Sequence, residues 1–219
     1  MKRLYITATL LLIVAANSFA QQTRLNLYGN YAFDDKVDSY YSNTSYFSGK
    51  IKGGFLWGAG LEFRLQHDYG LELSYHRMDT KAPTEYYSNG IKNTNFDVAL
   101  NYIMIGGVRA VHTGTKAEPY GGMSIGVDVI DVKNPDNNTS QSATKFAWGL
   151  KGGVNVWASD KVGLKFQAQL LSSVQSAGGG LYFGTGGAGA GISTYSSMLQ
   201  FVLGGGLTFK FGGAHAAHK

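Results

Sequence analysis

Apolar and polar residues alternate with a period of two along most of the chain, which is the pattern of β-strands with one apolar and one polar face. The pattern covers eight segments: 24–33, 51–65, 69–76, 95–104, 122–129, 146–156, 162–170 and 199–211. They are about as long as tilted strands that cross a bilayer (~9–11 residues) and longer than the usual strands of soluble sandwiches (~5–6 residues). The pattern therefore predicts an all-β fold: an eight-stranded antiparallel up-and-down transmembrane β-barrel.

The connections between these segments alternate in length. We expect long polar loops at 34–48, 79–93, 130–144 and 172–196, and short links at 66–68, 111–118 and 158–161. Short periplasmic turns and longer extracellular loops are typical of outer-membrane barrels. This places four loops outside the cell and both ends of the barrel domain on the periplasmic side.

The apolar face of each segment is expected to point outward, because a charge there costs ~2–4 kcal/mol at the bilayer midplane. In the fourth segment this rule assigns the following residues to the lipid: Phe96, Val98, Leu100, Tyr102 and Met104. Charged residues on the opposite faces then form a polar network in the lumen: Glu62, Arg64, Glu72, Asp97, Asp128, Lys151 and Lys165.

A three-residue turn at 66–68 places Glu62 opposite Glu72. Since two buried carboxylates need a compensating charge, we expect Arg64 or a lumen lysine between them. Lumen-side glycines such as Gly58 and Gly60 make room for these long side chains. An eight-stranded barrel is just wide enough for side chains to fill, so a continuous water pore is not expected.

The N-terminus has the pattern of an export signal. Lys2 and Arg3 precede an apolar run at 4–16, and small residues follow before Gln21. We therefore expect a cleaved signal peptide at 1–20, a barrel domain at 21–211 and a short periplasmic tail at 212–219. Loss of two cations lowers the formal net charge from +5 to +3, which is too small and too scattered to indicate nucleic-acid binding. The absence of Cys excludes disulfides and thiolate metal sites.

Two motifs resemble those of outer-membrane barrels of the OmpA-, OmpX- and OmpW-like type, often labelled porin-family. Residues 119–126 (Pro-Tyr-Gly-Gly-Met-Ser-Ile-Gly) resemble a Pro-Tyr-x-Gly-x-Gly strand start, with Ser124 at the middle glycine. Residues 206–211 (Gly-Leu-Thr-Phe-Lys-Phe) are similar to the C-terminal strand signal, although 212–219 follow it. The resemblance implies an integral protein of the outer membrane, with membrane lipids and, during insertion, the barrel-assembly machinery as partners.

Residues with catalytic or ligand-binding chemistry are few. Ser74, His76 and Asp79 could supply a nucleophile and base, yet same-face neighbours on a strand lie ~7 Å apart, which is loose for a hydrogen bond. Carboxylates and amides could hold Ca²⁺ in the first and third loops, although turn-forming Asp and Asn are the simpler interpretation: Asp34, Asp35, Asp38, Asp131, Asn134, Asp136, Asn137 and Asn138. The Gly-rich stretch at 178–191 is read as a loop or hairpin rather than a nucleotide site. We expect no catalytic residue, cofactor or metal.

The remaining functional signal is a group of loop tyrosines: Tyr40, Tyr41, Tyr46, Tyr86 and Tyr87. Tyr suits recognition of partners or glycans, but it also concentrates at membrane interfaces. We expect a non-enzymatic outer-membrane protein that presents four extracellular loops as a structural or surface-interaction platform. The alternatives are OmpW-like passage of small or hydrophobic solutes and a membrane-embedded hydrolase.

Overall fold

The structure is a computed structural model that describes residues 22–42, 45–65, 68–87, 91–136, 138–174, 180–184, 187–191 and 198–212. Within 36–49, 85–92 and 180–191 it describes the backbone only. The predicted signal peptide at 1–20 and residues 213–219 of the predicted tail lie outside the described residues and stay predictions. No helix in the described part of the chain is long and apolar enough to cross a membrane.

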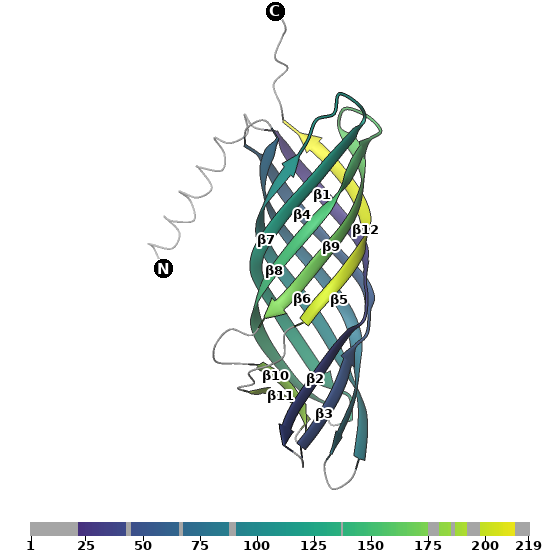
Figure 1. The fold of residues 1–219 in the computed structure, drawn as a ribbon, viewed down its shortest axis with the longest axis vertical. Coiled ribbons are helices and arrows are strands. Elements are labelled where there is room, and N and C mark those ends of the chain that lie inside the picture. The colour runs from purple at the N-terminus through teal and green to yellow at the C-terminus, as the bar shows by residue number, and fades with distance from the viewer. Residues whose placement is uncertain are drawn as a thin grey trace, which may run out of the picture.

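Eight antiparallel strands form a closed ring, which confirms the predicted fold (Figure 1). Around the ring they are β5 (Tyr69–Tyr87), β4 (Gly54–Arg64), β1 (Thr23–Ala32), β12 (Met198–Phe211), β9 (Val162–Val174), β8 (Thr139–Trp157), β7 (Ala117–Asn134) and β6 (Ile91–Ala110). Pairing of β6 with β5 closes the ring. Closure leaves no open sheet edge around the ring, which is what a β-structure needs inside lipid.

The two ends of the barrel differ. At one end, called here the turn end, the links are short and Thr23 of β1 pairs with Phe211 of β12. At the other, called the hairpin end, β2 (Asp35–Ser42) pairs with β3 (Ser45–Ile51), and β3 pairs with β5 beyond the ring. A separate hairpin of β10 (Gly180–Gly184) and β11 (Gly187–Gly191) contacts β8 at this end (Figure 1). The Gly-rich stretch is thus a hairpin in its described part.

Most of the residues predicted to form the first three long loops are strand instead. β5 continues to Tyr87, β6 begins at Ile91, β7 continues to Asn134 and β8 begins at Thr139. The polar residues in these segments suggested loops, but several whose side chains the structure describes, such as Asp79, Asp131 and Lys133, occupy the outer face of a sheet that extends past the apolar part of the barrel. Polar composition alone therefore did not distinguish a loop from a strand with one water-exposed face.

The outer face changes from apolar to polar along β5, β6, β7 and β8. One row of residues paired across these strands points outward and is mostly apolar: Tyr75, Ile103, Val127 and Phe146. The next row toward the hairpin end is mixed: Arg77, Asn101, Val129 and Thr144. The two rows after it are polar apart from one alanine: Asp79, Ala99, Asp131 and Ser142, then Lys81, Asp97, Lys133 and Ser140.

The inner face changes from polar near the turn end to apolar near the hairpin end. At the hairpin end the lumen holds an apolar cluster that includes Phe96, Val98, Leu100, Tyr102 and Met104, all at most 3% exposed. The prediction that these five residues face lipid was wrong, because in this strand the outward positions are instead Ile103 and Ile105 and, further on, Asn101, Ala99 and Asp97. Where water surrounds the wall, apolar side chains are buried inside.

Ile51 was also predicted to face outward with Phe55, and this too was wrong. Ile51 is 5% exposed, whereas Phe55 is 63% exposed on the outer wall. Lys52 and Gly53 interrupt the strand between them, which shifts the alternation by one residue. Gly53 is required at this break, because a Cβ there would lie 2.4 Å from the carbonyl oxygen of Ala32.

The change of faces predicts a pattern of accessibility along β6. Because the chain has no Cys, single-cysteine variants can be read without background. In lipid vesicles, Asp97→Cys should react rapidly with a water-soluble maleimide, and Asn95→Cys should match it as a control. Ile103→Cys should resist that reagent. When the unfolded variant is labelled there with a fluorescent probe and then folded into vesicles, a quencher in the lipid phase should quench the probe. Val98→Cys, which points into the lumen, should react slowly with the maleimide. Faster reaction there than at Asp97→Cys would contradict the assignment.

Candidate functional site

The lumen near the turn end contains buried charges and amides from several strands. The chief members are Arg24 and Asn26 of β1, Glu62 and Arg64 of β4, Glu72 of β5, Glu118 of β7, Lys151 and Asn155 of β8, and Lys165 of β9. Each lies on the inward face because the outward positions of the same strands are apolar. This set is called the lumen network below.

Glu62 and Glu72 lie directly opposite each other on β4 and β5, which confirms the expected register. The Arg64 guanidinium lies 3.2 Å from Glu62, and the Lys151 ammonium forms an ion pair with Glu72. Between the carboxylates, the Asn26 amide donates to Glu72 at 2.9 Å and to Glu62 at 3.4 Å. The Tyr28 hydroxyl also donates to Glu72. Each buried carboxylate thus has a cation and further donors.

A second ion pair lies closer to the turn end. Arg24, which is fully buried, donates two hydrogen bonds to Glu118 at 2.5 and 3.1 Å. The Asn155 amide donates to the same carboxylate at 3.1 Å. His112, at the rim, lies 3.3 Å from Glu118. This bidentate geometry is the strong form of a charge-assisted hydrogen bond, and it links β1 to β7 across the lumen.

Aromatic rings hold two further lysines of the lumen. The Lys165 ammonium lies 3.9 Å from the ring centroid of Tyr120, and the Lys210 ammonium lies 3.4 Å from that of Trp157. Such contacts stabilise a cation that has been partly removed from water. Tyr120 in turn donates to Gln167 at 2.9 Å, so ring and amide together fill the space across the barrel.

Two glycines of β4 make the network possible. A Cβ at Gly60 would lie 2.7 Å from a carboxylate oxygen of Glu72, and one at Gly58 would lie 2.6 Å from the ring nitrogen of His76. At Gly58 it would also lie 2.4 Å from the backbone oxygen of Tyr75, which cannot move aside. These glycines therefore leave the space that the long side chains occupy, as the sequence predicted.

The fold agrees with the comparisons to known proteins. The sequence profile of the outer membrane protein beta-barrel domain matches residues 6–193. The chain belongs to this family. No curated protein matches the chain at a significant level of sequence similarity.

Solved structures of outer-membrane proteins show the same fold as this outer membrane beta-barrel protein. Neisserial surface protein A is 15% identical, with a TM-score of 0.55, and the match covers 86% of this chain and 97% of that one. The outer membrane protein OprG from Pseudomonas aeruginosa is 11% identical, with a TM-score of 0.57, over 88% of this chain and 97% of that one. At these identities the likeness concerns the fold. Together with the family match it supports an integral position in the outer membrane.

Two of the residues predicted for the polar network of the lumen do not belong to the lumen network of this family member. Asp97 is on the outer wall, where it lies 3.2 Å from Lys81, so its assignment to the lumen was wrong. The reason is that the outer face of β6 changes from apolar at Ile103 to polar at Asp97. Asp128 is inside as expected, but beside the apolar cluster rather than in the lumen network; it accepts a hydrogen bond from Ser173 at 2.6 Å.

The residues considered for hydrolysis do not come together. Ser74 and His76 are buried and point inward, whereas Asp79 points outward and pairs with Arg77 at 2.6 Å. His76 instead lies with its ring 5.0 Å from that of Tyr28. The trio therefore has no shared face.

Several of the residues considered for Ca²⁺ are engaged in other contacts. Asp34 pairs with Lys50, and Asp35 accepts a hydrogen bond from the Leu199 amide at 2.9 Å. Asn134 accepts a hydrogen bond from the Asp136 amide at 2.9 Å, as in an Asx turn. The structure gives no group of three metal-ligating side chains in its described part. Asn137 and the side chain of Asp38 lie outside the described residues.

Sequence reasoning missed the pairing of Arg24 with Glu118. The alternation places Arg24 on the inner face, but Glu118 falls at the end of a segment read as a link. β7 begins one residue earlier, at Ala117, so Glu118 points into the barrel. Pro119, which cannot donate to a ladder, is accommodated near the start of the strand.

The ion pair between Lys151 and Glu72 predicts a large effect of removing one partner. Lys151→Met leaves a buried carboxylate without its cation, and we expect a loss of about 3–5 kcal/mol in the free energy of unfolding. Adding Glu72→Gln should recover much of the loss, because both charges are then gone. Urea unfolding in lipid vesicles, followed by Trp fluorescence, measures both.

Lys81→Met is the matched control, since its pair with Asp97 is about half exposed on both sides and should be worth about 1 kcal/mol or less. The interpretation of the lumen pair fails if Lys151→Met costs no more than this control.

Proposed function

We propose that this outer-membrane barrel is a non-enzymatic protein whose plugged lumen supports a rigid surface platform. The hairpin end is extracellular in this proposal, and both ends of the barrel domain are periplasmic. The outward apolar side chains around the ring, such as Ile103, Val127 and Phe146, are called the apolar belt. The platform consists of the strands that extend beyond this belt, together with the β2–β3 and β10–β11 hairpins. Insertion by the barrel-assembly machinery remains an expectation from the C-terminal strand.

The observation that carries the proposal is the filling of the lumen in two stacked compartments. The lumen network fills the half near the turn end, and the apolar cluster fills the half near the hairpin end. Members of both compartments are almost fully buried: Arg24, Leu100 and Tyr102 have 0% exposure. Among the described residues these two fillings support a plug better than a path for solutes, and the separated Ser74, His76 and Asp79 give hydrolysis no support.

The position of the tyrosines favours surface contact over membrane anchoring. Tyr40 and Tyr46 are paired in the β2–β3 hairpin, of which the structure describes the backbone only. Phe33, an exposed aromatic residue directly after the end of β1, lies seven residues before Tyr40. At ~3.4 Å per residue and a tilt of ~40°, Tyr40 lies roughly 18 Å farther out. The polar layer of one leaflet is only about 5–7 Å thick.

The plug predicts that the protein forms no open pore. Purified, folded protein in a planar bilayer with concentrated KCl should give no stepwise conductance under conditions in which a general porin does. The physical reason is that ions cannot replace the buried side chains of either compartment without unfolding them. Reproducible ohmic steps from a single folded species would contradict the proposal and favour solute passage.

The platform predicts a separable effect of the hairpin tyrosines. Tyr40→Ser/Tyr46→Ser should lower retention of protein-bearing cells on arrays of immobilised glycans and proteins by about tenfold, as loss of aromatic contact residues does at interfaces. The free energy of unfolding should change by less than about 0.5 kcal/mol, as for surface positions. Tyr31→Ser, in the apolar belt, is the control that should reduce stability. If the hairpin variant behaves like this control and retention is unchanged, the tyrosines anchor the barrel instead.

A further inference from the structure

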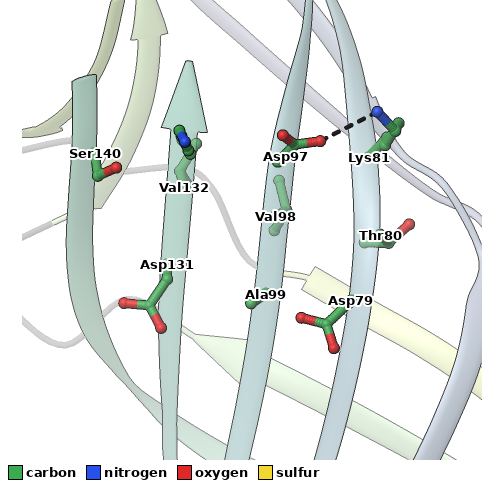
Figure 2. A pocket seen from close by; sticks show the side chains of 10 residues that line it. Asp79, Thr80, Lys81, Asp97, Val98, Ala99, Asp131, Val132 and Ser140 are labelled. Atoms are coloured by element: carbon green, nitrogen blue, oxygen red, sulfur yellow. Dashed lines mark ion pairs between the residues drawn. The ribbon is translucent and has the colours of Figure 1, made fainter. Parts of the chain in front are cut away.

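A groove lies in the outer wall where the strands pass beyond the apolar belt (Figure 2). Its volume is about 400 Å³, and β5, β6, β7 and β8 line it. The floor is Ala99, and the rim carries three carboxylates and two ammonium groups. Figure 2 shows Asp79 and Asp131 on the strands either side of Ala99, and the ion pair between Lys81 and Asp97.

Strand register explains why a depression forms at this point. Ala99 is paired with Asp79 on one side and with Asp131 on the other, so a methyl group stands between two longer side chains. The next row places Asp97 between Lys81 and Lys133. The groove therefore runs across neighbouring strands and opens sideways, away from the barrel axis.

Ion pairs within the wall leave one group of each sign available. Arg77 holds Asp79 through two hydrogen bonds, at 2.6 and 3.0 Å, and keeps the pKa of that carboxyl below its usual range. Lys81 neutralises Asp97. Asp131 and Lys133 have no ion-pair partner within the described part of the chain, and Asp131 accepts only a 3.3 Å hydrogen bond from Asn101. A matching ligand carries hydroxyl donors and an anionic substituent.

The height of the groove indicates which part of a membrane lipid could reach it. Ala99 is four residues beyond Ile103, which among the described side chains of β6 is the strongly exposed apolar residue nearest the hairpin end. At ~3.4 Å per residue and ~40° tilt this is roughly 10 Å farther from the membrane centre. A phospholipid headgroup layer of about 5–7 Å falls short of this height, whereas a headgroup built from sugars reaches it.

We propose that this groove binds the sugar headgroup of a glycolipid in the outer leaflet. Sugar hydroxyls donate to Asp131, and a phosphate or carboxylate substituent accepts from Lys133. The acyl chains lie along the apolar wall directly below, formed by Ile103, Ile105 and Ile125, which are 46–52% exposed. This continuity of polar groove and apolar wall favours a lipid over a soluble glycan. The inference rests on the proposed orientation but not on the plug or the platform tyrosines.

The test uses the full folded chain and rough lipopolysaccharide as the probe. Protein is reconstituted with phosphatidylethanolamine and phosphatidylglycerol, with or without the probe, and retained lipid is counted by native mass spectrometry. Ala99→Phe fills the groove and should reduce retained lipopolysaccharide by about tenfold. Ala168→Phe is the matched control, since Ala168 points outward from β9 on another part of the wall and should retain the wild-type amount.

Lys133→Glu provides a second reading, because it reverses the cation without adding bulk and should weaken retention by a similar factor. Heat-modifiable gel migration shows that each variant is folded. Wild-type retention in both groove variants would overturn the proposal. So would displacement by the free core oligosaccharide as readily as by the intact glycolipid, since that result assigns the groove to soluble glycans. A conducting pore in the earlier bilayer test would leave this result unaffected.

Discussion

The surroundings of each long strand change part-way along its length, and this change decides which side chains face inward. Over the apolar belt, a charge on the outer wall costs ~2–4 kcal/mol at midplane, so the charged residues lie in the lumen. Beyond the belt the outer wall is in contact with water, and burial of apolar side chains inside the barrel lowers the free energy of the fold. β6 shows both regimes: Ile103 faces outward on one side of the change and Asp97 on the other. The rest of the architecture follows from this constraint.

The lumen is consequently divided into two parts held by different forces. Near the turn end, charges removed from water need partners, and pairs such as Arg24 with Glu118 link strands that are distant in sequence. Near the hairpin end, the apolar cluster resembles the core of a small soluble barrel, and the buried Asp128 beside it accepts a hydrogen bond from Ser173. The two parts fail differently: losing one member of an ion pair leaves an uncompensated charge, whereas truncating Leu100 leaves a cavity. A closed wall with both fillings is the basis of the proposed platform.

Sequence reasoning found the fold because eight alternating segments and their turn signals are local. It also found the opposition of Glu62 and Glu72, since a short turn sets the register. It misplaced Asp97 and the apolar residues of β6 because alternation gives two faces without saying which surroundings each one meets. Resolving that requires knowing where the membrane ends on the strand, which depends on the neighbouring strands. The partners of Arg24 depend on pairings across the lumen, which no local pattern contains.

Strands in place of the expected loops change what the outer surface can do. Rows of side chains on a sheet are spaced ~4.8 Å across strands, and the backbone hydrogen bonds of the ladder hold them there. A ligand that contacts such rows does not have to order a flexible segment, so less conformational entropy is lost on binding. The row containing Ala99 between Asp79 and Asp131 therefore offers a preformed shape. Its position just beyond the apolar belt means that a lipid held by its tail brings the headgroup to that shape without a search in solution.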